Sequence, residues 1–235
     1  MAFPTIADAD TKNGTVAANS TSWTLTYPTN VVSGDLLLCF LAVDGSSTVT
    51  ASGWSAVNGT SAAISLAGLL KIADGTETGT FVATISGSEQ GGWRIFRVTG
   101  WFGSGLQGGS WVVGNDGVGM GAANAASATS TPDPPSCNPA QWDVEDTLWF
   151  AVCSLDTSRT ISVYPYVDRN TADVSGGANG ATLGVCTTTS ATASLDPGTF
   201  TISASDDWIA ITVAIRPAAV VAVPYYRPYP QLLAQ

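Results

Sequence analysis

The sequence of 235 residues contains no histidine and only 8 lysine and arginine residues. Without histidine it cannot form a Ser-His-Asp triad, a Cys-His pair or a His-ligated zinc or iron site. Charged residues make up 11% of the chain, well below the usual share in globular domains. The 18 acidic residues give a net charge of -10, so the chain lacks the basic face that nucleic acids and anionic membranes attract. We therefore expect no nucleic-acid partner and no membrane partner.

Long apolar runs and targeting signals are also missing. The longest apolar run, residues 36–43, has the length of a strand and is far shorter than the roughly 18 residues of a membrane span. Residues 1–8 lack the basic and apolar regions of a secretory signal, so we expect synthesis in a reducing cytoplasm. None of the four cysteines forms a Cys-x-x-Cys pair; we interpret Cys39, Cys137, Cys153 and Cys186 as buried thiols, although the sequence leaves disulfides open.

Strand patterns account for most of what the chain does contain. Helical periodicity is nearly absent, and short apolar or alternating runs are separated by clusters of Gly, Asn, Asp and Ser. Residues 36–43 form a continuous apolar run, which predicts a central strand buried on both faces. The sequence therefore predicts an all-β protein, an antiparallel, jelly-roll-like β-sandwich.

The strand pattern divides into two halves. Residues 15–102 and 137–217 are separated by residues 103–136, which are rich in Gly, Ala and Ser and predict a long loop. The halves align in order, which predicts an internal duplication: residues 34–40 align with 145–151, 48–54 with 160–166, 79–81 with 198–200, and 93–95 with 208–210. We favour one sandwich with interleaved halves over two separate sandwiches, and the sequence leaves both open.

The C-terminal residues 218–235 change character again. Their prolines oppose helix and central strand and favour an extended arm. Exposed apolar surface of this size usually docks on something, and we interpret the arm as a partner-binding segment rather than one that packs on its own domain. The residues expected to bind are Val223, Tyr225, Tyr226, Arg227, Tyr229, Leu232 and Leu233.

No residue pattern points to catalysis or to a bound cofactor or metal. The carboxylate pairs that a glycosidase would need are Asp206 with Asp207, the acids of residues 143–146, and Asp8 with Asp10. We interpret all of them as turn and strand-start residues, and a hydrolase using Asp206 or Asp143 is the competing hypothesis. We therefore expect no enzymatic activity, no cofactor and no catalytic or metal site.

Three tryptophans near or in the long loop are candidates for an exposed aromatic surface. Trp101, Trp111 and Trp142 could stack on sugar rings if neighbouring polar groups held the hydroxyls.

The overall pattern resembles virion structural proteins of tailed bacteriophages. The resemblance covers about residues 15–217 and rests on residues 31–38, Asp44-Gly45, 52–54, 71–78 and 213–217. The chain departs from that pattern at residues 164–166, where a second Gly-Trp or Gly-Tyr is expected, and in its Pro/Tyr tail.

The resemblance implies a structural role in the virion for a protein made in the host bacterial cytoplasm. It carries no catalytic residues. We expect a capsid decoration (cement) protein on the outer shell, with the major capsid protein and further copies of itself as partners. By analogy the homo-oligomer would be a trimer. The alternative is a tail or fibre-associated adhesin that binds host surface glycans, and the sequence does not separate head from tail.

Overall fold

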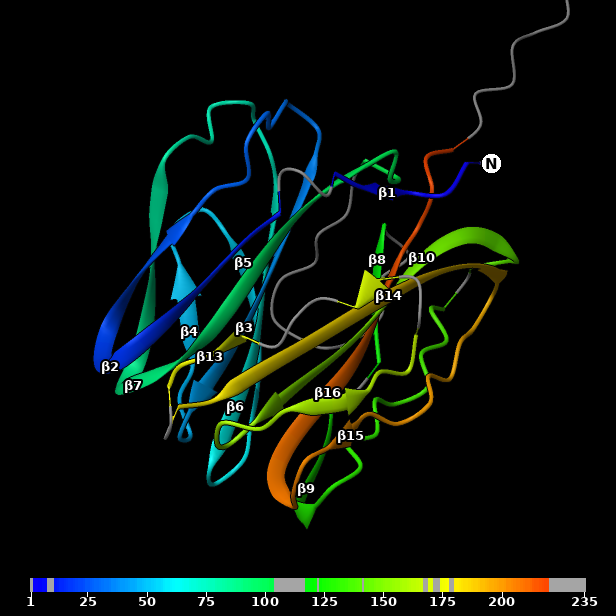
Figure 1. The fold of residues 1–235 in the computed structure, drawn as a ribbon. Helices are drawn as coiled ribbons and strands as arrows, with labels where there is room; N and C mark the ends of the chain where they lie inside the picture. Colours follow the sequence, from blue (N-terminus) through cyan, green and yellow to red (C-terminus); the bar gives the residue numbers. More distant parts are fainter. Residues whose placement is uncertain are drawn as a thin grey trace, which may run out of the picture.

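The computed structural model describes residues 2–7, 11–103, 117–121, 123–140, 142–166, 169–170, 174–177 and 180–219. Every regular element in these ranges is a β-strand, and two antiparallel sheets form a sandwich-like arrangement (Figure 1). The prediction of an all-β sandwich is confirmed.

The first half of the chain forms one sheet. Its strands are β1 (Thr5–Ile6), β2 (Lys12–Thr26), β3 (Leu36–Asp44), β4 (Val49–Ala51), β5 (Ser55–Thr60), β6 (Ile64–Ile72) and β7 (Thr80–Thr99). The order is β1-β7-β3-β6-β5, and β2 and β4 also pair with β7. Strand β7 is long enough to pair with β3 through its C-terminal part and with β4 through its N-terminal part.

The second half forms the other sheet. Its strands are β8 (Val118–Met120), β9 (Asn124–Thr129), β10 (Glu145–Leu155), β12 (Arg169–Asn170), β13 (Val174–Ser175), β14 (Thr182–Thr192) and β16 (Asp206–Ile215). The order is β12-β14-β10-β16-β8, with β13 on β14 and β9 on β16. A separate two-stranded ribbon joins β11 (Ile161–Val163) to β15 (Thr201–Ile202).

Two expectations need correction. The described strands of the first sheet all end by Thr99 and those of the second all begin at Val118 or later, so the interleaved, jelly-roll-like exchange of strands between sheets is not seen among them. The segment 103–136 is not wholly a loop, because β8 and β9 lie within it and pair with β16. Their Gly- and Ala-rich sequence has low strand propensity, and long-range pairing with β16 overrides it.

The largest core lies between the two sheets and draws residues from both halves. Phe40, Phe96 and Phe150 meet there, with ring centroids 5.3–6.3 Å apart. Burial of these large side chains holds the sheets face to face.

Further cores cover the outer faces of the sheets. Because side chains alternate along a strand, Leu37, Cys39 and Leu41 of β3 point away from the other sheet into a second cluster with residues of β2 and β4. The β11–β15 ribbon covers the outer face of the second sheet in the same way. Strand β3 is therefore buried on both faces, as the apolar run predicts. The four cysteines are buried and free, and burial raises the pKa values of the Cys137 and Cys186 thiols to about 12.

Candidate functional site at the end that carries both termini

Both ends of the described chain reach the same end of the sandwich, which we call the terminal end (Figure 1). Strands β3 and β10 begin there, and β7 and β16 end there. Beyond β16, Pro217 forms a bridge with Trp101, and the Ala218 N–H donates to the Gly100 carbonyl at 2.9 Å. A Cβ placed on Gly100 would lie 3.9 Å from the Phe3 carbonyl oxygen, so the C-terminal exit lies beside β1.

Arg216 fixes the point at which the chain leaves the sheet. Its Nε donates to Glu145 Oε2 at 2.7 Å, and its Nη2 donates to Oε1 of the same carboxylate. The guanidinium also lies over the rings of Phe102 and Trp142, 4.8 and 5.7 Å from their centroids. A bidentate ion pair between arginine and a carboxylate is strong and fixes the geometry of both side chains, and the contacts with aromatic rings add to it. The root of the C-terminal segment is therefore held rigidly against the sandwich.

Two of the three tryptophans predicted to be exposed are buried. Trp101 is 4% exposed; it joins the core between the sheets and donates from Nε1 to the Gly34 carbonyl at 2.8 Å. Trp142 is 6% exposed and packs on the outer face of the second sheet with Trp149. The prediction is wrong for both, because segments distant in sequence cover them. Trp111 and the seven predicted arm residues lie outside the described residues.

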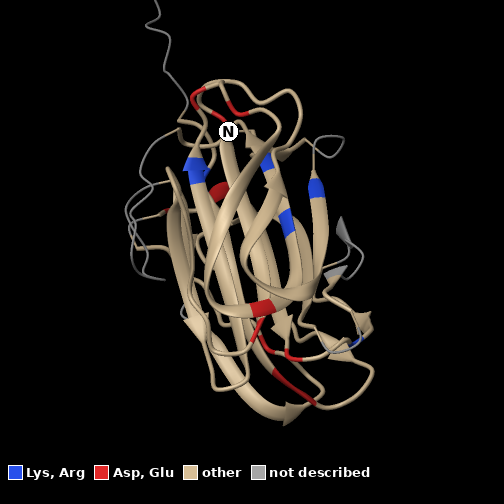
Figure 2. Ribbon diagram, turned by 90° about the vertical axis from the view of Figure 1, so that its left-hand side faces the viewer, with Lys and Arg blue, Asp and Glu red and all other residues tan. Residues whose placement is uncertain are grey.

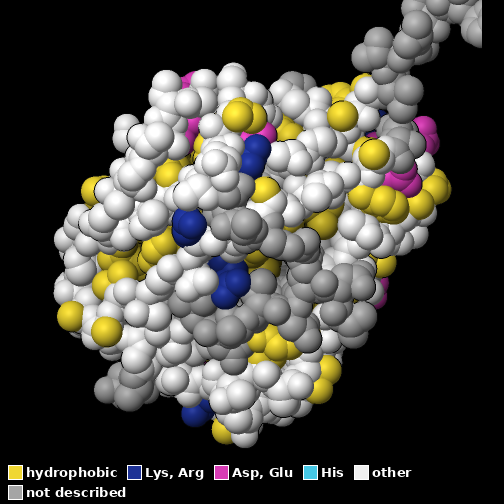
Figure 3. Space-filling model, turned by 45° about the horizontal axis from the view of Figure 1, so that its top comes forward, with side chains coloured by type: hydrophobic (Ala, Val, Ile, Leu, Met, Phe, Trp, Pro, Cys, Tyr) yellow, Lys and Arg dark blue, Asp and Glu magenta, His cyan; other side chains and the backbone are white. Residues whose placement is uncertain are grey.

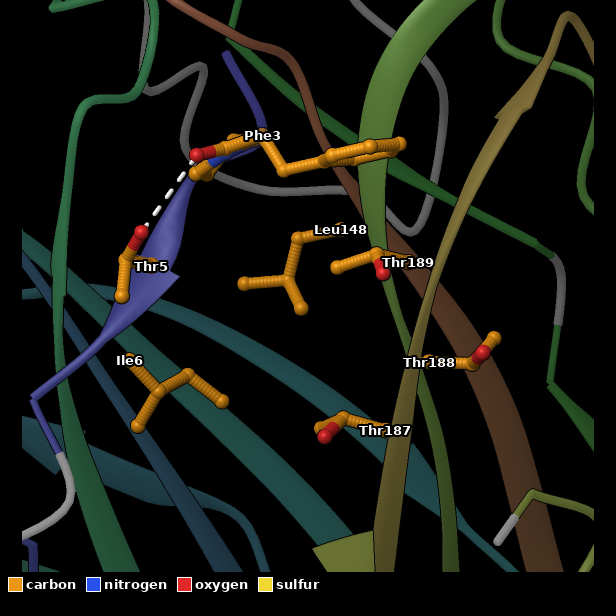
Figure 4. A pocket seen from close by; sticks show the side chains of 8 residues that line it. Phe3, Thr5, Ile6, Leu148, Thr187, Thr188 and Thr189 are labelled. Atoms are coloured by element: carbon orange, nitrogen blue, oxygen red, sulfur yellow. Dashed lines mark hydrogen bonds between the residues drawn. The ribbon is translucent and has the colours of Figure 1, made fainter. Parts of the chain in front are cut away.

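A groove opens at the terminal end between β1 and the second sheet (Figure 4). We call it the terminal groove; it has a volume of about 250 Å³ and is lined by Phe3, Pro4, Thr5, Ile6, Leu148, Thr187, Thr188 and Thr189. None of these side chains is charged. Leu148 and Ile6 are apolar, and the side chains of Thr187 and Thr189 point toward them, whereas that of Thr188 points to the other side of β14 (Figure 4). Such a lining suits an uncharged, partly apolar ligand.

The rest of the terminal end exposes several apolar side chains, and three of its cations, Lys71, Arg97 and Arg216, are paired with carboxylates. Four of its hydrophobic side chains are more than a third exposed, namely Phe3, Val32, Ile72 and Val144. Space filling shows hydrophobic groups scattered over this face, with Lys and Arg side chains near its centre and acidic side chains toward its edges (Figure 3). Arg97 Nε lies 2.6 Å from Asp35 Oδ2, and Lys71 Nζ lies 2.8 Å from Glu77 Oε1.

The opposite end of the sandwich, which we call the acidic end, joins the two sheets through carboxyl groups. The Asp44 side chain, at the end of β3, interacts electrostatically with that of Asp156, which follows β10. Burial raises the pKa of both groups, and for Asp156 the carboxylates of Asp206 and Asp44 contribute further, to about 6. Figure 2 shows acidic residues near both ends of the strands.

Sequence reasoning missed the Asp44–Asp156 pair, because its members come from different halves. Three of the acids that it did consider, Asp206, Asp207 and Glu145, have structural partners. Asp206 Oδ2 accepts from the Thr157 N–H at 3.1 Å and lies 3.2 Å from Arg159 Nε, and Asp207 Oδ1 accepts from the Ala128 N–H. Asp8 and Asp10 lie outside the described residues.

The described residues contain no group of three or more Cys, Asp or Glu side chains placed to hold a metal ion. They also contain no helix long and apolar enough to cross a membrane. Comparisons with protein-family models, curated proteins and solved structures found no match for this chain.

Proposed function

We propose that the protein is a structural component of a tailed-phage particle, a decoration protein that binds the outer capsid shell and stabilises contacts between capsomers. One observation carries this proposal: a densely packed sandwich ends in a rigidly held root, Arg216 to Ala218, from which an apolar Pro/Tyr segment continues. A rigid body with an anchored extension suits a protein that must span neighbouring subunits. The phage resemblance of residues 15–217 supports the same role.

The exposed apolar side chains of the terminal end favour this face as the one that meets the shell. Phe3, Val32, Ile72 and Val144 are each more than a third exposed. The partner in this proposal is the major capsid protein.

The alternative, a tail or fibre-associated adhesin that binds host glycans, loses most of its support. That function depended on tryptophans able to stack on sugar rings. Trp101 and Trp142 are buried. A stacking surface would depend on Trp111 alone, and a single ring gives little sugar specificity.

We also propose that the two halves arose by duplication of one unit. The central strands β3 and β10 each lie between the last long strand of their half, β7 or β16, and the other long strand, β6 or β14. The cross-strand pairs correspond as well: Trp93 pairs with Leu41 as Trp208 pairs with Leu155, and Val49 pairs with Ile85 as Ile161 pairs with Ile202.

The proposed duplication requires a different alignment of the central strands. Aligning residues 34–40 with 145–151 matches Leu38, which faces the core between the sheets, with Trp149, which faces outward. Since a one-residue shift exchanges the two faces of a strand, the alignment must change by an odd number of residues.

The test of the decoration role is binding to purified capsids of the phage that encodes the chain. We expect the full chain to bind the shell to saturation and a chain ending at Ala219 to bind much more weakly. Equal thermal unfolding midpoints for the two chains would show that the sandwich is intact without residues 220–235. A full chain that does not bind the shell would contradict the proposal.

A further inference from the structure

We propose that the terminal groove binds residues 220–235 of a second copy of the chain, so that copies join through exchanged arms. This inference deepens the proposed function by naming the site that receives the arm. It rests on the position and chemistry of the groove, on the composition of the segment, and on how far that segment reaches.

The groove has the chemistry of a peptide site. One wall is the extended segment Phe3 to Ile6, and the other is formed by consecutive threonines of β14 (Figure 4). Pro4, Ile6 and Leu148 are buried around an uncharged floor. A volume of about 250 Å³ has room for one or two side chains of the size of Pro or Tyr. Grooves that combine an aromatic residue with hydroxyl groups commonly bind proline-rich extended peptides.

The C-terminal segment has the matching composition. Residues 220–235 contain three prolines, three tyrosines and no acidic residue, and Arg227 is their single charged side chain. Because the whole chain carries a net charge of -10, this segment is positive relative to the body that it would bind. Tyrosine also offers a large apolar ring and a hydroxyl group that can bond to threonine or to a backbone carbonyl.

The sequence at the start of the segment favours a neighbouring copy over the chain's own groove. The exit at Ala218 lies beside β1, so binding to its own groove would require a sharp reversal soon after this residue. Residues 218–223 contain none of the Gly, Pro, Asn, Asp or Ser residues that tight reversals use. Val220, Val221 and Val223 are β-branched and favour extended backbone. Fully extended, residues 220–235 reach about 50 Å, enough to cross to an adjacent copy.

When the arm of each copy enters the groove of the next copy, the contact is head-to-tail. A head-to-tail contact closes into a ring if the rotation between copies is suitable, and a threefold ring is the smallest such ring beyond a dimer. A threefold ring of this kind would be the trimer that is expected by analogy.

The test is the mass of the protein in solution, measured by light scattering without any capsid. The variants are a chain ending at Ala219, which keeps the groove and loses the arm, and Thr189→Arg, which fills the groove at an exposed position. Thr50→Arg is the matched control, because it places the same side chain on an exposed strand threonine of the other sheet.

We expect wild type and Thr50→Arg to exceed the 24.0 kDa of one chain, and the truncated chain and Thr189→Arg to be monomers. Mixing the two monomers should give a 1:1 complex, since one supplies a groove and the other an arm. A monomeric wild type, a variant that keeps the wild-type mass, or a mixture that forms no complex would each overturn the proposal. None of these results depends on capsid binding, so the decoration role stands or fails separately.

Discussion

The two ends of the sandwich differ in the partners of their carboxyl groups. At the terminal end, Arg97, Lys71 and Arg216 each bind a carboxylate that is almost fully buried. At the acidic end, Asp156 interacts with the carboxyl group of Asp44 and with further carboxylates nearby. The first arrangement is complete with every group charged, whereas neighbouring carboxylates repel each other once they are ionised.

This difference bears on the proposed attachment of the protein to a capsid shell. At the terminal end three cations are each paired with a carboxylate, and apolar side chains and a groove are accessible there. The acidic end repels other acidic surfaces once it is ionised. We therefore place the contact with the shell at the terminal end, and two experiments test the contrast.

The largest effect on stability is expected from removing the ion pair between Arg216 and Glu145. Arg216→Ala leaves the Glu145 carboxylate buried without its partner and should lower the free energy of unfolding by about 3 kcal/mol. Arg216→Lys keeps the charge but loses the bidentate geometry, so it should lower the free energy of unfolding by less than Arg216→Ala does. Chemical denaturation of the three proteins measures both. A loss below about 1 kcal/mol for Arg216→Ala would mean that the root is not held by this pair.

A smaller effect is expected from Asp156→Asn at the acidic end. Folding raises the pKa of Asp156 to about 6, so the folded state binds more protons than the unfolded state between about pH 4 and 6. This group therefore makes the wild type less stable as pH rises through that range, with no further change above it. The asparagine side chain cannot ionise, so the variant should lack that decline and be more stable at pH 7 by about 1 kcal/mol, after allowance for solvent screening.

Denaturation at a series of pH values from about 4 to 8 tests this prediction. Asp143→Asn, which removes an exposed acid at the terminal end, is the matched control and should keep the wild-type pH dependence. Identical pH profiles for Asp156→Asn and wild type would show that the carboxyl pair does not couple the two sheets.

Much of the fold was predictable because its central strands are strongly apolar. Residues 36–43 correspond to β3, and the strands expected near residues 146–155 and 208–215 correspond to β10 and β16. The continuity of β7 was not predictable, since the glycines at 87, 91 and 92 read as breaks in the sequence. The assignment of one sheet to each half was also hidden, because strand pairing depends on contacts between distant residues.

The candidate site was harder to predict than the fold. The sequence indicated an arm after residue 217, but Arg216 and Glu145 are 71 positions apart, and nothing local links them. The burial of Trp101 depends on Gly34 and Pro217 in the same way. Neither the groove nor the Asp44–Asp156 pair has a local signal, since each combines segments from both halves of the chain.

The most direct test of the central claim is the location, orientation and copy number of the protein in purified particles, imaged by electron cryo-microscopy. The account predicts many symmetry-related copies on the outer shell, with the terminal end facing the capsid and the acidic end facing solvent. A few copies at the tail, or copies whose acidic end faces the shell, would contradict it.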